Sequence, residues 1–139
     1  MRIFTGIALI CVIALSTIVV GGCGNPGAQQ IADAFVRAMV AGDTAKAASY
    51  WDYNSIGREG NSDWDTFGIS QRNLIIKESK WADKRAEQLD YWKLHFSRTT
   101  KVGDVVEMDD TADAEIIDGR ANRLKLIRYN EKWYVSELK

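Results

Sequence analysis

His95 is the only histidine in the chain and the first candidate for acid–base chemistry. An imidazole can accept or release a proton near neutral pH, which suits a general acid or base. Tyr91 and Lys93 precede it at a spacing of two residues, which places the three side chains on one face of a β-strand. If that face lines a pocket, the three form a candidate site; if it faces solvent, they are ordinary strand residues. No carboxylate partner for His95 is identified, because the nearby Asp90 belongs to the start of the strand.

A cluster of acidic residues raises the question of calcium: Asp104, Glu107, Asp109, Asp110, Asp113 and Glu115. A calcium loop of the helix–loop–helix type needs a glycine at its sixth position and a glutamate at its twelfth. A loop that starts at Asp109 has Ala114 and Arg120 at these positions. Asp113 and Glu115 alternate with alanines, as the solvent face of a strand does. We therefore expect a solvated hairpin and no metal or cofactor site.

Cys23 follows an apolar segment in which no residue from Ile3 to Val20 is charged. These 18 residues reach only the lower limit for a helix that spans a bilayer. Length alone therefore does not separate a permanent anchor from a signal peptide. The small residues Gly21 and Gly22 favour cleavage, because signal peptidases need small side chains beside the cut.

The segment Val20-Gly21-Gly22-Cys23 resembles the lipobox of bacterial lipoproteins. The resemblance implies that cleavage falls between Gly22 and Cys23, that residues 1–22 are a signal peptide and that Cys23 carries a diacylglycerol. Cysteine usage agrees, because Cys11 would leave with the signal and Cys23 would have no partner for a disulfide or a shared metal. Two acyl chains are enough for stable anchoring to a membrane. An uncleaved helix and an ordinary secretory signal are the alternatives.

The elements that must position any site begin with two helices. Apolar residues recur at helical spacing over Ile31–Met39, and Gly42 ends this first helix. Asp43 is typical of an N-cap and predicts a short second helix over Thr44–Trp51.

The middle of the chain predicts a loop and a third helical region. Asp52–Thr66 is polar and contains glycines, which indicates a loop whose Trp64 folds back onto the body. A third helix is expected within Asp65–Leu89, with a break near Gly68. Five tryptophans could form an aromatic cage, but such residues more often fill the core of a small domain: Trp51, Trp64, Trp81, Trp92 and Trp133.

From Asp90 onward the apolar period changes from about four residues to two, which is typical of strands. Trp92, Leu94 and Phe96 then alternate with polar residues and predict a strand that contains His95. Turn residues at Asp109-Asp110-Thr111, Asp118-Gly119 and Asn130-Glu131 separate four further strand segments: Val105–Met108, Ala112–Ile117, Ala121–Tyr129 and Lys132–Leu138. Helices followed by an antiparallel meander predict an α+β domain with helices on one face of the sheet.

This order of elements resembles the nuclear transport factor 2-like superfamily, whose cystatin-like, cone-shaped α+β fold packs N-terminal helices on a curved antiparallel sheet. The resemblance rests on Ile31-Ala32-Asp33-Ala34-Phe35-Val36-Arg37-Ala38-Met39, on Gly42-Asp43 with the alanine-rich helix after it, and on Tyr129-Asn130-Glu131-Lys132-Trp133-Tyr134-Val135. It implies one domain over residues 28–139, after a lipidated N-terminus and short linker over 23–27. Members include isomerase-like and dehydratase-like enzymes, ligand-binding proteins and accessory domains, so the fold does not choose among these functions.

Charge and motifs narrow the range of functions that the sequence allows. The chain has 18 Lys and Arg residues against 19 Asp and Glu residues and no basic patch suited to nucleic acid. The exported body carries no nucleophile elbow, phosphate-binding glycine loop or metal-ligand spacing. We therefore expect a lipid-anchored envelope protein with a non-catalytic binding or accessory domain for a protein or small ligand. The alternatives are a small isomerase-like or dehydratase-like enzyme that uses a pocket His95, and a structural subunit of an envelope assembly.

The lipid anchor also predicts where the protein lies in the cell. In a Gram-negative bacterium we expect the periplasmic side of the outer membrane, because Gly24 stands where an aspartate is associated with retention at the inner membrane. In a Gram-positive bacterium we expect the cell surface.

Overall fold

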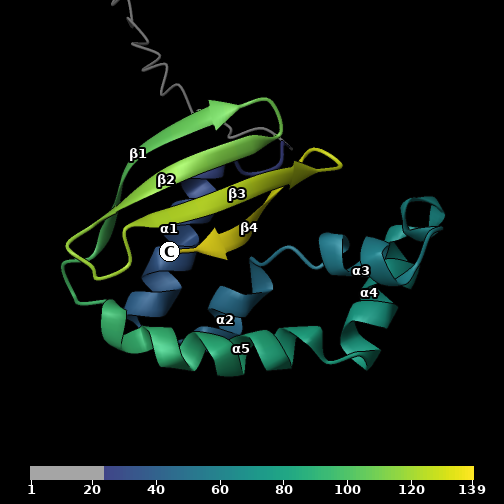
Figure 1. The fold of residues 1–139 in the computed structure, drawn as a ribbon, viewed down its shortest axis with the longest axis horizontal. Coiled ribbons are helices and arrows are strands. Elements are labelled where there is room, and N and C mark those ends of the chain that lie inside the picture. The colour runs from purple at the N-terminus through teal and green to yellow at the C-terminus, as the bar shows by residue number, and fades with distance from the viewer. Residues whose placement is uncertain (1–23) are drawn as a thin grey trace, which may run out of the picture.

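The computed structural model describes residues 24–139, and Figure 1 shows their arrangement. The predicted signal peptide, its cleavage position at Gly22 and the lipidation site Cys23 lie outside the described residues. Within the described part, no helix is long and apolar enough to cross a membrane. The division into a signal, a linker and a domain stays a prediction.

Helices form the first part of the described chain, and an antiparallel meander forms the second. The helices are α1 (Ala28–Val40), α2 (Thr44–Ser49), α3 (Asn54–Gly60), α4 (Ile69–Glu78) and α5 (Trp81–Trp92), with short 3-10 helices η1 (Trp64–Thr66) and η2 (Lys93–His95). The strands are β1 (Lys101–Met108), β2 (Thr111–Ile117), β3 (Arg123–Tyr129) and β4 (Lys132–Leu138). Each strand pairs with the next in the order β1-β2-β3-β4. The predicted α+β class is confirmed.

The main core lies between α1 and one face of the sheet (Figure 1). Phe35 and Met39 are four residues apart on α1 and are both buried, as expected for the apolar face of an amphipathic helix. In β2 exposed and buried residues alternate, so Ala112, Ala114 and Ile116 all face the core. Removal of this apolar surface from water is the main force that holds α1 to the sheet.

The predicted boundaries of the first two helices are largely confirmed. Gly42 has a φ of +74°, a conformation that L-residues rarely adopt, and it ends α1. The Asp43 carboxylate caps α2 by accepting a hydrogen bond from the Lys46 N–H at 3.0 Å. α2 stops short of Trp51, because that residue pairs with Val135 of β4.

The loop predicted over Asp52–Thr66 is wrong, because this segment contains α3 and η1. Trp64 is fully buried, which confirms its predicted return to the body. Its indole packs against Gly57, and its Nε1 donates to the side-chain oxygen of Asn54 at 3.2 Å. Packing on Trp64 therefore holds a helix that its own glycines disfavour.

The predicted third helical region is two helices. Gly68 does not break a helix but precedes α4 in an extended conformation, with φ −65° and ψ 158°. The break between α4 and α5 lies at Lys80, whose φ of +54° takes the backbone out of the right-handed helix.

The strand predicted around His95 is wrong, because α5 continues to Trp92 and η2 follows it. Leu89, Trp92 and Phe96 are spaced by three and four residues, which places them on one side of a helix. All three pack in or against the core, whereas Leu94 is 85% exposed. The apparent recurrence of apolar residues at every second position therefore depended on Leu94, which is exposed to solvent.

The hairpins agree with the prediction in order and in the position of their turns. β1 begins four residues earlier than predicted and contains a bulge between Val102 and Val105. β3 begins two residues later than predicted. Asp113 and Glu115 are exposed on β2, which confirms the solvated strand face. Among residues 24–139, no group of three or more His, Cys, Asp or Glu side chains is placed to hold a metal ion.

Candidate functional site

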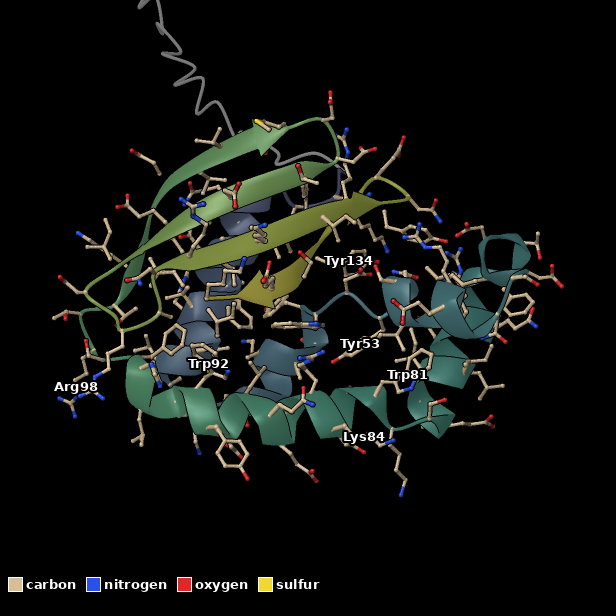
Figure 2. The ribbon with its side chains drawn as sticks, in the orientation of Figure 1. Tyr53, Trp81, Lys84, Trp92, Arg98 and Tyr134 are labelled. Carbon is tan, nitrogen blue, oxygen red and sulfur yellow. The ribbon has the colours of Figure 1, made fainter. Side chains whose placement is uncertain are left out.

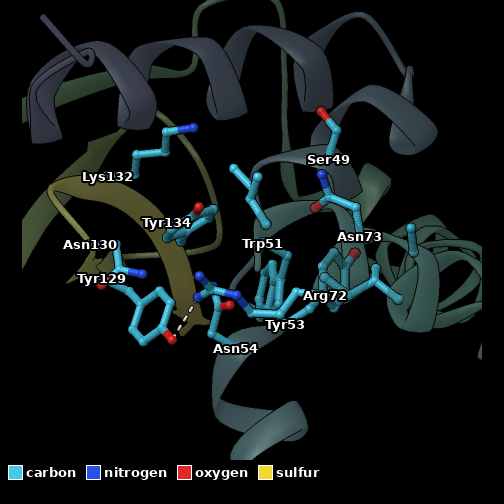
Figure 3. A pocket seen from close by; sticks show the side chains of 13 residues that line it. Ser49, Trp51, Tyr53, Asn54, Arg72, Asn73, Tyr129, Asn130, Lys132 and Tyr134 are labelled. Carbon is cyan, nitrogen blue, oxygen red and sulfur yellow. Dashed lines mark hydrogen bonds between the residues drawn. The ribbon is translucent and has the colours of Figure 1, made fainter. Parts of the chain in front are cut away.

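A cavity of about 390 Å³ lies where α2, α3, α4 and the start of α5 meet the β3–β4 hairpin (Figure 3). We name it the Arg72 cavity after a side chain on its wall. Thirteen side chains line it, and they include both apolar and polar groups. Small-molecule sites have volumes of about 300–1,000 Å³. The cavity is therefore large enough for a small organic ligand.

One face of α4 forms a wall of the Arg72 cavity. Ile69, Arg72, Asn73 and Ile76 all line it, at the spacing of three and four residues that places side chains on one side of a helix. No residue of α4 is buried, and the helix packs against α5. This face of α4 therefore presents both apolar and hydrogen-bonding groups to a ligand.

A second wall is the short extended segment that runs beside β4. Trp51 pairs with Val135, and the Asp52 N–H donates to the Val135 carbonyl oxygen at 2.8 Å. Trp51, Tyr53 and Asn54 line the cavity, and each is 7% exposed. The buried Asp52 carboxylate accepts a hydrogen bond from the Asn54 N–H at 2.9 Å, which fixes the start of α3. This wall is therefore held by backbone pairing and is largely pre-formed.

Arg72 is the central polar group of the cavity. Its Nη1 donates to the Tyr129 hydroxyl at 2.7 Å, as the dashed line in Figure 3 shows. With its amide oxygen turned toward Arg72, Asn130 accepts from Nη1 at 3.1 Å and from Nη2 at 3.3 Å. The Arg72 Nε is buried and has no hydrogen-bond partner within residues 24–139. Because a guanidinium has more N–H donors than these contacts use, Arg72 can still donate to a ligand.

Tyr129 positions Arg72 from the side of the sheet. The guanidinium groups of Arg58 and Arg72 lie 4.8 Å and 5.3 Å from the centroid of its ring. The Tyr129 hydroxyl also donates to the Asp65 carboxylate at 2.5 Å. Burial raises the pKa of the Tyr129 phenol, and the hydrogen bond to Asp65 raises it further. The phenol therefore stays neutral at physiological pH and accepts a hydrogen bond from Arg72 without offsetting its charge.

The lining of the cavity carries positive charge and no acid of its own, while the nearest carboxylates, Asp52 and Asp65, lie behind its wall. Arg72 and Lys132 are its two cations, and the thirteen lining residues include no Asp, Glu, His or Cys. The field of two cations attracts anions. General acid–base catalysis most often uses His, Asp or Glu, and none of these lines the cavity. The arrangement is thus suited to holding an anion.

Tyr53 is a neutral, buried group on the same lining. Its hydroxyl donates to the Ala48 carbonyl oxygen at 2.7 Å. Burial raises the pKa of Tyr53 from 10.0 to about 12, although the nearby charge of Arg85 opposes this rise. The pKa of Tyr53 is higher in the folded protein than in the unfolded chain. The neutral phenol therefore stabilises the fold below pH 10.0, and this contribution is lost as the pH rises to about 12.

We expect Tyr53→Phe to remove this alkaline loss of stability. Near neutral pH the variant loses one buried hydrogen bond, which lowers the free energy of unfolding by about 0.5–1.5 kcal/mol. Between pH 10.0 and about 12 the parent loses stability that the variant does not, so the difference between them shrinks and then reverses. Urea unfolding of both proteins across this range measures the difference. A constant difference would contradict the raised pKa.

The three side chains predicted around His95 do not come together. A helix turns by about 100° per residue, so side chains two positions apart in α5 and η2 point in nearly opposite directions. Tyr91 is 83% exposed, and the Lys93 Nζ pairs with the Asp90 carboxylate at 2.9 Å. None of the three residues lines the Arg72 cavity.

His95 packs at the end of α5 that lies away from the cavity. Figure 2 shows Trp92 at this end of α5 and Trp81 at the other. The His95 ring centroid lies 5.0 Å from that of Trp92. Within the described residues, its buried Nδ1 has no hydrogen-bond partner and the ring forms no ion pair with a carboxylate. Its carbonyl oxygen accepts from the Arg120 N–H at 3.0 Å, so its backbone joins η2 to the turn after β2.

Sequence reasoning missed the polar residues of the cavity: Arg72, Tyr129, Lys132 and Tyr134. Tyr129, Lys132 and Tyr134 lie in the segment that carries the fold resemblance, but no local motif joins that segment to Arg72 of α4. One signal was present on α4, where Ile69 and Ile76 flank Arg72 at helical spacing.

Comparison with known proteins finds a similarity in structure. No family model and no curated protein matches this chain. A solved structure that is similar to it is a Campylobacter jejuni protein described as an NTF2-like transpeptidase. The two share 13% sequence identity with a TM-score of 0.44, and the match covers 77% of this chain and 94% of that chain. The α+β fold of this chain follows from its own helices and four-stranded sheet.

Proposed function

We propose that this protein is an exported, lipid-anchored binding protein whose Arg72 cavity holds a small anionic molecule without chemical conversion. The observation that carries this proposal is the charge of the lining, with two cations and no acidic residue. The Nη2 of Arg72 also keeps one N–H beyond its contact with Asn130, and a ligand can accept from it. The lining offers no support for the isomerase-like alternative, because His95 is absent from it.

The lining of the cavity favours a ligand with both an anionic and an apolar part. Arg72 can hold a carboxylate or phosphate through a charge-assisted N–H···O bond from Nη2, which keeps an N–H free of Tyr129 and Asn130. Trp51, Ile69 and Ile76 supply apolar surface on the same lining. A water molecule occupies about 30 Å³ in the liquid, so the cavity has room for a ligand of roughly a dozen non-hydrogen atoms.

The anchor and the fold family belong to the same proposal. The lipobox-like Val20-Gly21-Gly22-Cys23 supports cleavage before Cys23 and attachment of lipid to it. The order of helices and meander supports membership of the nuclear transport factor 2-like superfamily, which includes ligand-binding proteins. A membrane-tethered domain of this kind would hold its ligand at the surface of the envelope.

Arg72→Met is the variant that tests the cavity. We expect it to weaken binding of an anionic probe by about 10- to 100-fold, which corresponds to the 1.5–3 kcal/mol of a charge-assisted hydrogen bond. The probes are octanoate and indole-3-acetate, each measured by calorimetry beside its uncharged primary amide. At least one anion should bind the parent protein. The parent should bind the corresponding amide only weakly, with an affinity close to that of Arg72→Met for the anion.

Arg98→Met is the matched control, because Arg98 is exposed and lies at the end of α5 away from the cavity (Figure 2). It removes the same charge from the protein and should leave the affinity unchanged. The proposal fails if neither anion binds the parent, or if both variants weaken binding equally.

A further inference from the structure

Two turns of the sheet lie together at one end of the domain. The β1–β2 turn contains Asp110, whose carbonyl oxygen accepts from the Arg128 N–H at 2.7 Å and whose carboxylate pairs with the Arg128 guanidinium at 2.9 Å. Arg128 is close to the end of β3, so the β3–β4 turn is beside the β1–β2 turn (Figure 1). We name this region, with the last residues of β1, the tethered end.

The chain enters the described domain at the tethered end. The side-chain Nδ2 of Asn25 donates to the carbonyl oxygen of Glu131, in the β3–β4 turn, at 3.2 Å. Cys23 precedes Asn25 by two residues, and consecutive Cα atoms are about 3.8 Å apart. The Cα of Cys23 is therefore within about 8 Å of the Cα of Asn25, whatever path the chain takes.

Large apolar side chains are exposed at the same end. Met108 is 67% exposed and Val106 is 59% exposed, both near the end of β1. They pair with the exposed Thr111 and Asp113 of β2, which places them on the face of the sheet that points away from α1. Exposed apolar groups of this kind lower their free energy by contact with another apolar phase.

We infer that the tethered end rests against the lipid surface that holds Cys23, with Met108 and Val106 at the boundary between headgroups and acyl chains. The inference rests on the proposed lipid anchor at Cys23. The Asn25 hydrogen bond to the β3–β4 turn lies only two residues after the anchor, so the anchor stays beside this end of the domain. Acidic residues (Asp109 and Glu131) and basic residues (Arg128 and Lys132) both lie at this end, so the short tether and apolar contact favour this orientation, and net attraction to anionic lipid does not.

The opposite end of the sheet provides a matched reference position. There the Thr100 hydroxyl donates to the Asp118 carbonyl oxygen at 2.7 Å, which joins the β2–β3 turn to the segment after α5. Leu94 lies near this segment and is 85% exposed. Strands of seven residues extend about 23 Å, so Leu94 and Met108 lie at opposite ends of the sheet.

The test compares Met108→Cys with Leu94→Cys in the processed, lipid-modified protein. Cys11 leaves with the signal and lipid occupies the Cys23 sulfur, so the introduced thiol alone takes an environment-sensitive fluorophore. The proteins are placed in vesicles of phosphatidylcholine and phosphatidylethanolamine that contain a headgroup nitroxide lipid as quencher. The fluorophore at position 108 should lose most of its emission, and the one at position 94 should keep its emission.

Two outcomes count against the inference and are distinguishable. Equal quenching at both positions, in protein whose intact mass shows the lipid on Cys23, overturns the orientation and leaves the proposed function standing. An intact mass without lipid overturns the anchor and the orientation together, while anion binding to the Arg72 cavity can still be measured. Equal thermal unfolding of the two labelled proteins and the parent shows that neither substitution alters the fold.

Discussion

Replacement of Gly57 by alanine is expected to lower the free energy of unfolding by about 2–3 kcal/mol or more. A Cβ at this position would lie 2.4–2.5 Å from three atoms of the Trp64 ring. Trp64 cannot easily give way, because it is fully buried and its Nε1 is bonded to Asn54 at 3.2 Å. Chemical denaturation of the purified domain measures the loss.

Gly60→Ala is the control for this prediction, because Gly60 belongs to the same helix and a Cβ there meets nothing within 4 Å. It should leave stability unchanged or raise it by up to about 1 kcal/mol, since alanine restricts the unfolded chain. Equal losses in the two variants would mean that the contact with Trp64 does not decide the effect, because alanine has the higher helix propensity and a Cβ at Gly60 meets nothing. Asn54 lines the Arg72 cavity, so Gly57→Ala should also weaken binding of an anionic probe.

Local signals were sufficient for the elements whose ends are fixed by their own residues. Asp43 caps α2 as its position predicted, and Gly42 ends α1 through its positive φ. The turns also followed from local chemistry, because Asp118 and Asn130 adopt positive φ values where the sequence placed a turn. In these cases the residues that decide the structure are neighbours in the chain.

The errors arose where distant contacts decide the structure. α3 contains Gly57 and Gly60, which made a loop the better local prediction, but Trp64 packs on the helix and holds it. Around His95, alternation of apolar residues competed with a helical spacing that joins Leu89 to Trp92. The helical spacing prevailed because both residues pack in or against the core.

The candidate site could not be assembled from the sequence for a related reason. Arg72 and Tyr129 share a hydrogen bond of 2.7 Å although 57 positions separate them. Arg72 belongs to no motif, and Tyr129 belongs to a segment that suggested a fold and not a site, so each looks like an ordinary surface residue of its own element. Only the packing of α4 near the β3–β4 hairpin brings them together, and no local pattern predicts that packing.

Trp51→Ala should have the largest effect on stability and binding together. Trp51 is 7% exposed, its ring centroid lies 6.1 Å from that of Phe35, and the Arg85 guanidinium lies 4.2 Å from its ring. Removal of a buried aromatic side chain costs about 3–5 kcal/mol. The Arg85 Nε is already buried without a partner in the described part, so the variant also deprives this cation of its aromatic contact.

The same side chain connects stability to ligand binding. Trp51 lines both the Arg72 cavity, of about 390 Å³, and a second cavity of about 410 Å³ beside Arg85 and Leu89. Loss of the indole removes a wall that the two share, so a ligand in the Arg72 cavity loses apolar contact and water gains access to Arg72. We therefore expect Trp51→Ala to abolish measurable binding of octanoate and indole-3-acetate even under conditions where the protein remains folded.

Trp51→Phe separates the two effects. Phenylalanine keeps an aromatic face for Arg85 and part of the shared wall, so it should retain more stability than alanine and bind the anions with intermediate affinity. Urea denaturation and calorimetry on the same preparations give both quantities. If Trp51→Phe is as unstable as Trp51→Ala but binds the anions like the parent, the indole supports the core and takes no part in the cavity. If both variants are stable and bind like the parent, the wall that Trp51 forms has no role in recognition, and the charge of Arg72 and Lys132 alone must hold the ligand.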